Sequence, residues 1–537
     1  MITLDPDVPV DGDVLVAAIP FDPGSLNPVV APYALSAMIG DLIQPGMVRR
    51  HVEKGELIYE PLLASEFSFS ADGTTLTYKL NEGLTWEDGT PLTSKDVAFT
   101  QALIADPVVA SNWYGDAQHI ASIETPDDRT VVFRFTRPQN PMLQQAYTIR
   151  GIVPQHVLET ADRATLRGHV SARNPLASGS YRIAEWRPDS KLILAPNPRA
   201  PAHLKPHLER IVFKVLPEYS TRLMELEVGS VDLVTDIEVS DIPGLHEKRD
   251  LDLVRMPSAS MDYLGYNLTD PRFTDLRVRR ALTMAIDRER IIRDYLSVEG
   301  TTYGTHAVGT ISPTQTGWYA SNIIPLPYDP RAAMDLLDAS GWKDADKDGV
   351  RERGDQVMRF RLMVQTGSAE TKRLAVLVQA YLEPIGVIAE IDMVEPTRFA
   401  ELAREHQFEA ILWSFGANPA VDLSIQWSTG GQYNWYQYSN PAVDALIEKG
   451  LSTIDEVQRL IHADQPVTFL YWKDVIVGID RRFQGVEMNS FTVLHRIEEW
   501  YVPIAEHKYR GMMPFDVPVQ KDQVKPRAGD DLPPPPQ

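Results

Sequence analysis

A short strand-like run followed by an amphipathic helix pattern is the feature that most constrains the fold of this chain. Residues 263–267 read as a strand, and a turn rich in Pro and Asp follows them. The apolar residues after the turn recur at i, i+3, i+4, i+7 and i+8, the spacing of one helix face. They are Val278, Ala281, Leu282, Ala285 and Ile286. The unit is therefore predicted to be a strand, a turn and a buried helix.

Two aspartates mark where helices should begin in this unit. Asp275 can cap the first helix, because its carboxylate can accept hydrogen bonds from amides that have no partner in the first turn. Asp287 stands where a second helix would start, and Glu289 adds negative charge at that positive end. The arginines of the first helix are expected to lie mostly off its apolar face; they are Arg277, Arg279 and Arg280.

Length and composition bound the class of protein. The 537 residues suggest three or four domains of about 150 residues each, or two large lobes, and the hydrophobic content of 43% is ample for sizeable cores. A formal charge of −22 argues against nucleic acid or anionic membrane as a partner, because phosphate binding needs clustered Lys and Arg. The chain has no cysteine, which excludes disulfides, thiolate metal sites and cysteine nucleophiles.

No membrane span or targeting segment is expected in this sequence. No apolar run approaches the roughly 18 residues that a spanning helix needs. Met1 is followed by polar sequence rich in Pro and Asp, rather than by a basic and then apolar signal. If the protein is exported, we expect its targeting segment to lie outside these residues.

The rest of the pattern predicts an α/β chain with a low-complexity tail. A strand, a helix and a second strand follow one another within 360–393, which implies a parallel crossover. The Pro-rich residues 521–537 are predicted to be disordered. Strands are predicted at 13–21, 130–135, 226–237, 360–365, 387–393 and 409–413, and helices at 329–341 and 368–382.

Several separate blocks resemble one family. The pattern F-x-D-x-R-V-R-x-A-L-x-x-A-I-D-R at 273–288 resembles the most recognisable block of the extracytoplasmic solute-binding proteins of peptide/nickel-type ABC transporters, the dipeptide/oligopeptide-binding-protein-like family 5. The block LNEGLTWEDGTPLTSKDVAFT at 80–100 is the second specific match, and Thr93 with Asp96 forms a capping-box analogue within it. Shorter matches are Leu26-Asn27-Pro28, NPLASGSY at 174–181, and the G-x-V-D of 229–232.

The resemblance implies an α/β, two-lobed periplasmic-binding-protein type II fold with an extra α+β domain inserted in the first lobe. Lobe I would comprise 1–40, 163–257 and 472–520, the inserted domain 41–162, and lobe II 258–471. The chain would cross between the lobes near 258–263 and 467–472.

The same resemblance implies a binding function. The protein would capture a peptide-like solute between the lobes, close over it, and deliver it to an ABC permease in the membrane, without acting as an enzyme. It would be a periplasmic or cell-surface monomer that binds a small molecule or an oligopeptide and no nucleic acid. The alternatives are an oligosaccharide or other uncharged solute, or a sensory or chaperone-like binding module. A glycosidase is the enzymatic rival, although no H-E-x-x-H, P-loop or G-x-G-x-x-G motif is present.

The predicted ligand site is the aromatic segment 413–436. An aromatic, loop-rich stretch just after a strand suits a pocket at the carboxyl end of that strand. Relatives that bind peptides usually carry Asp-Pro where this chain has Asn418-Pro419, and Asp422 is a possible substitute for the missing charge. Each aromatic could equally be a core residue. The candidate ligand contacts are Tyr33, Trp413, Asn418, Asp422, Trp427, Asn434, Trp435 and Tyr436.

A second candidate site is the acidic stretch DADKDGVRERGD at 344–355. It matches D-x-D-x-D-G, with Asp355 at the twelfth position, where a calcium loop prefers Glu. A structural calcium ion and a plain acidic turn both remain open. The candidate ligands are Asp344, Asp346, Asp348, the Val350 carbonyl and Asp355.

Overall fold

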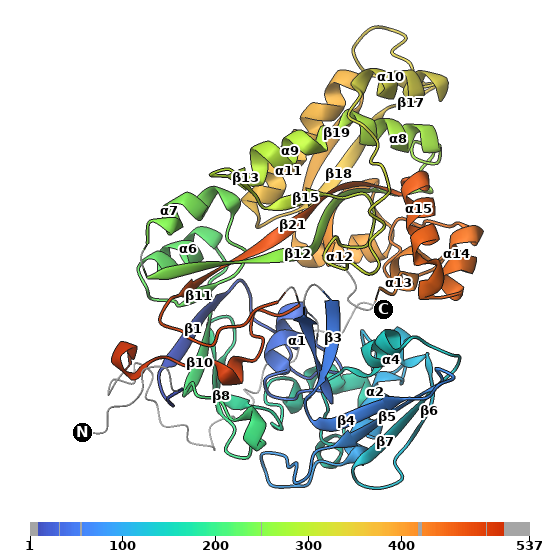
Figure 1. Ribbon diagram of the computed structural model, residues 1–537. Coiled ribbons are helices and arrows are strands. Elements are labelled where there is room, and N and C mark those ends of the chain that lie inside the picture. Colours follow the sequence, from blue (N-terminus) through green and yellow to red (C-terminus); the bar gives the residue numbers. More distant parts are fainter. Residues whose placement is uncertain are drawn as a thin grey trace.

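A computed structural model describes residues 9–31, 33–53, 56–248, 250–416, 421–489 and 491–509. Two α/β lobes share one continuous 11-stranded sheet, with the strand order β19-β18-β20-β12-β21-β11-β1-β10-β9-β8 and with β15 paired to β21. Figure 1 shows lobe II above, lobe I at the lower left, and a further domain with its own sheet at the lower right. This is the two-lobed α/β architecture predicted from the sequence.

Two long strands in the middle of the sheet join the lobes. Strand β12 (Leu251–Tyr266) pairs antiparallel with β21 (Val467–Asp480) along nearly its whole length. The register shifts between Met256 and Ser260, on either side of Pro257. Proline has no N–H to donate to the ladder, so it interrupts the pairing between the two halves of the sheet. We call β12 and β21 the hinge strands.

Lobe I is built around β1 (Val14–Ile19), the first predicted strand. It lies between β10 (Arg210–Val215) and β11 (Leu233–Val234), and it is parallel to both. All six residues of β1 are buried, as expected for a strand in the interior of a sheet covered on both faces. The remaining elements of the lobe are β8 (Tyr181–Arg187), β9 (Lys191–Pro196), α1 (Ala34–Gly40), α6 (Tyr219–Glu227) and α7 (Ile242–His246).

The further domain contains a hairpin and a four-stranded antiparallel sheet of order β4-β5-β7-β6. Thr93 and Asp96 form the expected capping box at the start of its longest helix, which satisfies amides that would otherwise be unpaired. The strands are β2 (Val48–Glu53), β3 (Glu56–Pro61), β4 (Ala64–Phe69), β5 (Thr75–Leu80), β6 (Ile120–Glu124) and β7 (Thr130–Phe135); the helices are α2 (Ser94–Ile104), α3 (Tyr114–Ala117), α4 (Pro141–Thr148) and α5 (Gln155–Leu158).

Lobe II contains the predicted parallel crossover. Strands β18 (Arg359–Gln365) and β19 (Ile388–Val394) are parallel, and helix α11 (Ala369–Leu382) connects them. Asp275 and Asp287 cap α8 (Leu276–Ala285) and α9 (Arg288–Tyr295) as predicted. The other elements are β20 (Ala410–Gly416), α10 (Pro330–Ala339), α12 (Pro396–Arg404), α13 (Ser424–Trp427), α14 (Pro441–Glu448), α15 (Ile454–Asp464), β13 (Ser297–Val298), β14 (Thr301–Thr302), β15 (Gly304–His306), β16 (Glu352–Arg353) and β17 (Gln356–Val357).

Two sequence predictions need correction. Arg279 is buried rather than off the apolar face, and its guanidinium donates to the carbonyls of Asp464, Gln465 and Phe273. An arginine whose N–H groups are all directed at carbonyls can be buried because its charge is solvated by the backbone. The strand predicted at 226–237 is mostly absent: α6 ends at Glu227, and only Leu233–Val234 pairs in the sheet.

A buried ionic cluster holds the base of lobe I together. The Arg482 guanidinium binds Asp13 at 3.1 Å and Asp232 at 2.6 Å, and all three side chains are almost fully buried. Asp232, the acid of the G-x-V-D match, also accepts the Val16 amide at 2.9 Å. The cluster therefore joins the end of β21 to the starts of β1 and β11.

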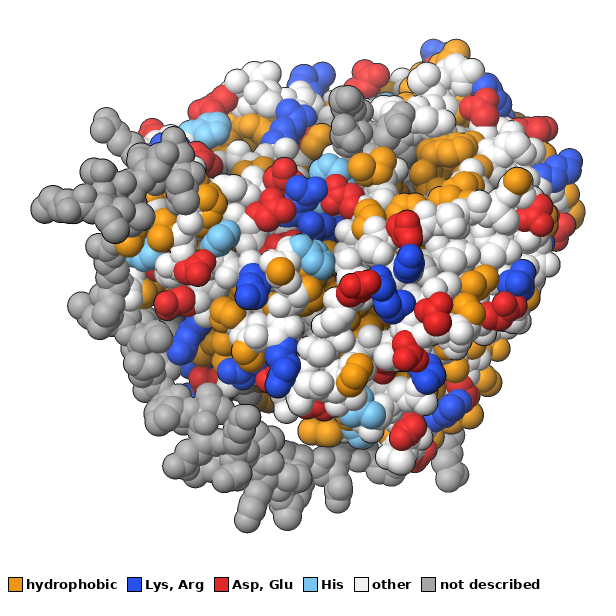
Figure 2. Space-filling model, turned by 60° about the horizontal axis from the view of Figure 1, so that its bottom comes forward, with side chains coloured by type: hydrophobic (Ala, Val, Ile, Leu, Met, Phe, Trp, Pro, Cys, Tyr) orange, Lys and Arg blue, Asp and Glu red, His pale blue; other side chains and the backbone are white. Residues whose placement is uncertain are grey.

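The surface carries charges of both signs. Figure 2 shows acidic and basic side chains interspersed over the face that it presents, rather than a patch of one sign. Within the part of the chain that the structure describes, no helix has the length and apolarity to cross a bilayer.

Replacing Arg482 should destabilise the fold far more than replacing its neighbour. Arg482→Met removes the guanidinium that pairs with two buried carboxylates and leaves only Lys508 near Asp232, and we expect it to lower the free energy of unfolding by about 3–5 kcal/mol in urea titrations. Arg481→Met is the matched control, because Arg481 pairs with Asp252 at the surface and such pairs contribute about 1 kcal/mol or less. Equal losses for the two variants would contradict a structural role for the cluster.

Candidate functional site

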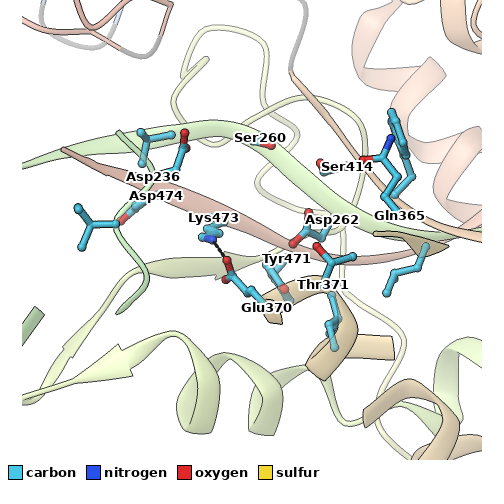
Figure 3. A pocket seen from close by; sticks show the side chains of 15 residues that line it. Asp236, Ser260, Asp262, Gln365, Glu370, Thr371, Ser414, Tyr471, Lys473 and Asp474 are labelled. Carbon is cyan, nitrogen blue, oxygen red and sulfur yellow. Dashed lines mark hydrogen bonds and ion pairs between the residues drawn. The ribbon is translucent and has the colours of Figure 1, made fainter. Parts of the chain in front are cut away.

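A cavity of about 240 Å³ lies beside the hinge strands. Its walls come from both lobes: Asp236 belongs to the loop after β11, and Glu370 and Thr371 lie in the first turn of α11 (Figure 3). The ends of β18 and β20 complete it, at the carboxyl edge where open α/β sheets bind ligands. Its volume is below the roughly 300–1,000 Å³ of sites that enclose a whole small ligand. The cavity can therefore hold one part of a larger solute.

Lys473 is the central charge of this cavity. Its ammonium binds the Glu370 carboxylate, and Asp262 and Asp236 lie close enough to act on it electrostatically. Burial acts to lower the pKa of Lys473, but Glu370, Asp262 and Asp236 outweigh it and hold the pKa above its usual value. The lysine is therefore a fixed cation among carboxylates at neutral pH.

Asp262 is a carboxylate of the cavity whose pKa is shifted far from its usual value. Burial raises the pKa of Asp262 to about 6, although Lys473 acts in the opposite direction. Tyr471 is fully buried beside it, and burial together with Asp262 raises the pKa of that phenol well above its usual value. The Tyr471 hydroxyl lies within hydrogen-bonding reach of the Asp262 carboxylate, and this contact opposes the rise in the pKa of Asp262.

An aromatic wall lies on the other face of β20. Trp413 stacks on Phe399 of α12 with ring centroids 4.4 Å apart, so one face of its indole is covered. Trp435 meets Trp413 edge-on at 5.6 Å, and Tyr433 meets Trp435 edge-on at 6.2 Å. Trp435 is half-buried and Tyr433 is 39% exposed, so both rings present surface to solvent.

Charged residues of the first lobe and the inserted domain form the opposite wall. The Asp41 side chain is exposed, yet burial by surrounding protein raises its pKa to about 6 against the influence of Arg50 and Arg150. An exposed group that is still desolvated lies at the bottom of a depression. Asp116 pairs with Arg150 at 2.6 Å, and both act on the pKa of Tyr433 in lobe II. The aromatic wall and the charged wall therefore face each other across a cleft.

A few polar contacts cross between the two sides. The Tyr147 hydroxyl of the inserted domain donates to Asp422 of lobe II at 3.3 Å. Arg373 of α11 binds Glu238 of lobe I at 2.5 Å. Both contacts join segments that are not paired in the shared sheet. They would have to break for the lobes to open about the hinge strands.

The structure separates the predicted ligand residues into two groups. Trp413 and Trp435 line the cleft, and Asp422 reaches its edge, where it also accepts from the Ser424 amide and hydroxyl. Tyr33 is 50% exposed and packs edge-on against Phe21 at the start of α1. Asn418 lies outside the described residues.

Trp427, Asn434 and Tyr436, three of the predicted ligand residues, are buried. The Trp427 indole N–H donates to Thr310 at 2.8 Å, and its ring stacks on Tyr436. Tyr436 packs so tightly on Gly265 that a Cβ there would lie 2.7 Å from the ring. Asn434 bonds the carbonyls of residues 428 and 438 and organises the turn. These contacts give all three residues packing roles among the described residues, and a role in ligand binding stays a prediction.

The acidic loop brings together a slightly different set of groups from the one predicted. Carboxylate oxygens of Asp344, Asp346, Asp348 and Glu352 lie within 4.8 Å of one another, and Glu352 takes the place expected for Asp355. The Asp348 carboxylate accepts the Val350 amide at 2.8 Å, as in an ordinary acidic turn. Calcium binding by this loop stays a prediction.

The sequence reading missed the polar residues of the hinge cavity. Lys473 and Asp474 interrupt the otherwise apolar strand β21, and a charge in the middle of a buried strand is costly unless it is paired or functional. That interruption was a usable signal. The sequence around Asp236 and Glu370 contains no comparable signal, because only the folded chain brings these two residues to the hinge.

Known proteins match this chain over most of its length. Residues 59–437 match the family described as bacterial extracellular solute-binding proteins, family 5. The oligopeptide-binding protein AppA of Bacillus subtilis is 26% identical over 450 residues, 80% of this chain and 81% of that protein. The dipeptide-binding protein of Escherichia coli is 26% identical over 481 residues, 81% of this chain and 85% of that protein.

Solved structures share the fold. The structure of AppA from Bacillus subtilis in complex with a nonapeptide superposes with a TM-score of 0.84 at 23% identity, covering 92% of this chain and all (100%) of that one. NikZ from Campylobacter jejuni in complex with Ni(L-His) gives a TM-score of 0.79 at 22% identity, with 91% and 99% covered. The family match spans well over half of the sequence, and the chain therefore belongs to the bacterial extracellular solute-binding proteins of family 5.

Proposed function

We propose that this protein binds a peptide-like solute between its lobes and delivers it to the permease of an ABC importer. The observation that carries the proposal is a cavity on the hinge strands with walls from both lobes. A solute that touches both walls stabilises the closed form, because those contacts are lost on opening. The family binds solutes and carries out no reaction on them, so the protein is not an enzyme.

The charges of the site favour a peptide over an oligosaccharide. A sugar would stack on aromatic faces; Phe399 covers one face of Trp413, whereas Trp435 and Tyr433 keep ring surface exposed. The hinge cavity instead presents carboxylates, an ammonium and a phenol, which suit the charged and amide groups of a peptide. The curated relatives named for oligopeptide and dipeptide binding are consistent with this choice.

Ligand-induced closure fits the exposed position of the ion pair between the two α/β lobes. The Arg373–Glu238 pair is partly exposed, and pairs of that kind contribute about 1 kcal/mol or less. A solute that touches both walls adds to the contacts that hold the lobes together. We further propose that the protein acts outside the cytoplasm as a monomer.

A thermal-shift screen should separate the ligand classes. Peptides of two to five residues, oligosaccharides and metal chelates are added in turn, and melting is followed by fluorescence. We expect a peptide at 100-fold its dissociation constant to add about 2.7 kcal/mol of stability. Stabilisation by oligosaccharides with none by peptides would contradict the proposal. Consumption of the added solute, followed by mass spectrometry, would contradict the non-enzymatic assignment.

Two tryptophans should separate binding from packing. Trp435→Ala removes a ring that faces the cleft, so we expect peptide affinity to fall tenfold or more while the empty protein keeps most of its stability. Trp427→Ala is the matched control: its ring is fully buried, and its loss should cost about 3–5 kcal/mol of unfolding free energy. Calorimetric titration and urea unfolding measure the two effects. A Trp435→Ala protein as unstable as Trp427→Ala would place Trp435 in the core.

A further inference from the structure

The hinge cavity carries more negative than positive charge. Three carboxylates, those of Asp236, Asp262 and Glu370, act on the single ammonium of Lys473. A fourth acid of the lining, Asp474, is paired with Arg255 at 2.5 Å. Lys473 is bonded to Glu370. One ammonium cannot neutralise three carboxylates, so the lining keeps an excess of negative charge when all of them are ionised, and Arg222 outside the lining offsets part of it at Asp236.

Asp262 and Asp236 are the acids left without a bonded counter-ion. Neither forms an ion pair within 4 Å with a residue that the structure describes. Asp262 is desolvated enough that its titration is displaced toward neutral pH. A desolvated carboxylate without a bonded cation destabilises the fold, and groups held in such a state cluster at functional sites.

The backbone at Asp236 has an uncommon conformation. Its φ is +58°, in the left-handed region that residues other than glycine seldom adopt. Aspartate tolerates this conformation, and Asp236 is one of eleven residues other than glycine that adopt a positive φ in the described part of the chain. The conformation belongs to a residue that supplies the lobe I wall of the cavity.

Uncharged polar groups surround Asp262 on the lobe II side. Figure 3 shows Thr371, Tyr471, Ser414 and Gln365 on that side of the Lys473–Glu370 pair, whereas Asp236 lies on the other side. The Tyr471 hydroxyl lies within hydrogen-bonding reach of the Asp262 carboxylate. The volume of about 240 Å³ has room for a side chain or a chain end. This part of the cavity combines one uncompensated carboxylate with neutral donors and acceptors.

We propose that the hinge cavity binds a positively charged group of the solute, an ammonium or guanidinium, against Asp262, with Asp236 adding long-range attraction from lobe I. The inference rests on the proposed peptide-binding function and deepens it, because it makes the protein selective for cationic peptides. The bound cation supplies the counter-charge that the empty protein lacks. Its binding energy therefore includes relief of the desolvation of Asp262.

The charge can come from the amino terminus or from a Lys or Arg side chain, and peptide chemistry distinguishes the two sources. A mixture of tetrapeptides rich in Lys and Ala is incubated with the full-length protein at pH 7.0, and retained peptides are identified by native mass spectrometry. Parallel mixtures are N-acetylated, or have norleucine in place of lysine, or both. We expect the mixture that carries neither charge to be retained at least tenfold less than the mixture that carries both. The single-charge arms show which source occupies the cavity.

Replacing the carboxylate should remove the selectivity. Asp262→Asn keeps the shape of the side chain, and we expect it to reduce the preference for cationic peptides to less than threefold. Asp236→Asn should reduce it by a smaller factor. Asp252→Asn is the matched control: Asp252 lies on the same strand, pairs only with Arg481 at the surface, and is distant from the cavity lining. The control should keep the full preference.

The inference also predicts a pH dependence. The groups that face Asp262 are Lys473 and Tyr471 on β21 and Glu370 on α11. A proton competes with the solute cation for Asp262, whose pKa lies at about 6. Affinity for a lysine peptide should therefore fall up to about tenfold from pH 7.0 to pH 5.0, and this fall should be absent in Asp262→Asn.

The empty protein offers a test that needs no ligand. The pKa of Asp262 is raised from 3.8 to about 6 on folding, so its ionisation destabilises the folded state above about pH 6 and not below pH 4. Asp262→Asn should therefore raise the melting temperature at pH 7.5 and leave it unchanged at pH 4. Asp252→Asn should shift it at neither pH.

The outcomes separate this inference from the proposed function. Equal retention of charged and uncharged peptides, or an unchanged preference in Asp262→Asn, overturns the inference and leaves peptide binding intact. Retention of no peptide by the wild-type protein overturns the proposed function, and the inference with it. A lower melting temperature for Asp262→Asn at pH 7.5 would show that Asp262 stabilises the empty fold, and would also overturn the inference.

Discussion

The antiparallel pairing of β12 with β21 is the interaction on which the rest of the structure depends. These strands belong to both lobes, so a single hydrogen-bonded ladder fixes where the lobes meet and which residues face each other across the cleft. The register shift around Pro257 interrupts that ladder between its two halves. A sheet that is continuous but locally interrupted can bend there without losing its core on either side.

The hinge strands also concentrate charge where a fold would ordinarily avoid it. Asp262 and Lys473 lie on neighbouring strands in the middle of the sheet, and Glu370 is brought to them by the first turn of α11. Asp262 weakens the empty protein, because its desolvation exceeds what the attraction of Lys473 returns. By contrast, the buried Arg482 cluster at the base of lobe I has its charges matched closely and holds three strand ends together. One cluster stabilises the fold, and the other leaves a charge for a solute to satisfy.

The sequence predicted local structure correctly where that structure depends on residues close by in the chain. Asp275, Asp287 and the Thr93–Asp96 box cap the helices as expected, since a cap depends on amides within one turn. The sequence did not predict the burial of side chains whose surroundings come from distant segments of the chain. Arg279 is buried because carbonyls at 464 and 465 come to meet it. Trp427 is a core residue because it contacts Thr310 and Tyr436 in the folded chain. Its position in the same aromatic sequence segment as Trp435 did not distinguish the two tryptophans.

The sequence by itself determined the family, the α/β class, the parallel crossover of lobe II and the absence of cysteine chemistry, because each is written in short spacings or in composition. Tertiary structure alone decided which aromatics face the cleft and which acids meet at the hinge. Asp236, Asp262, Glu370 and Lys473 are separated by up to hundreds of positions, and no local pattern records their meeting. Electrostatic energy depends on distance and burial in space, and both arise only when the lobes assemble around the shared sheet.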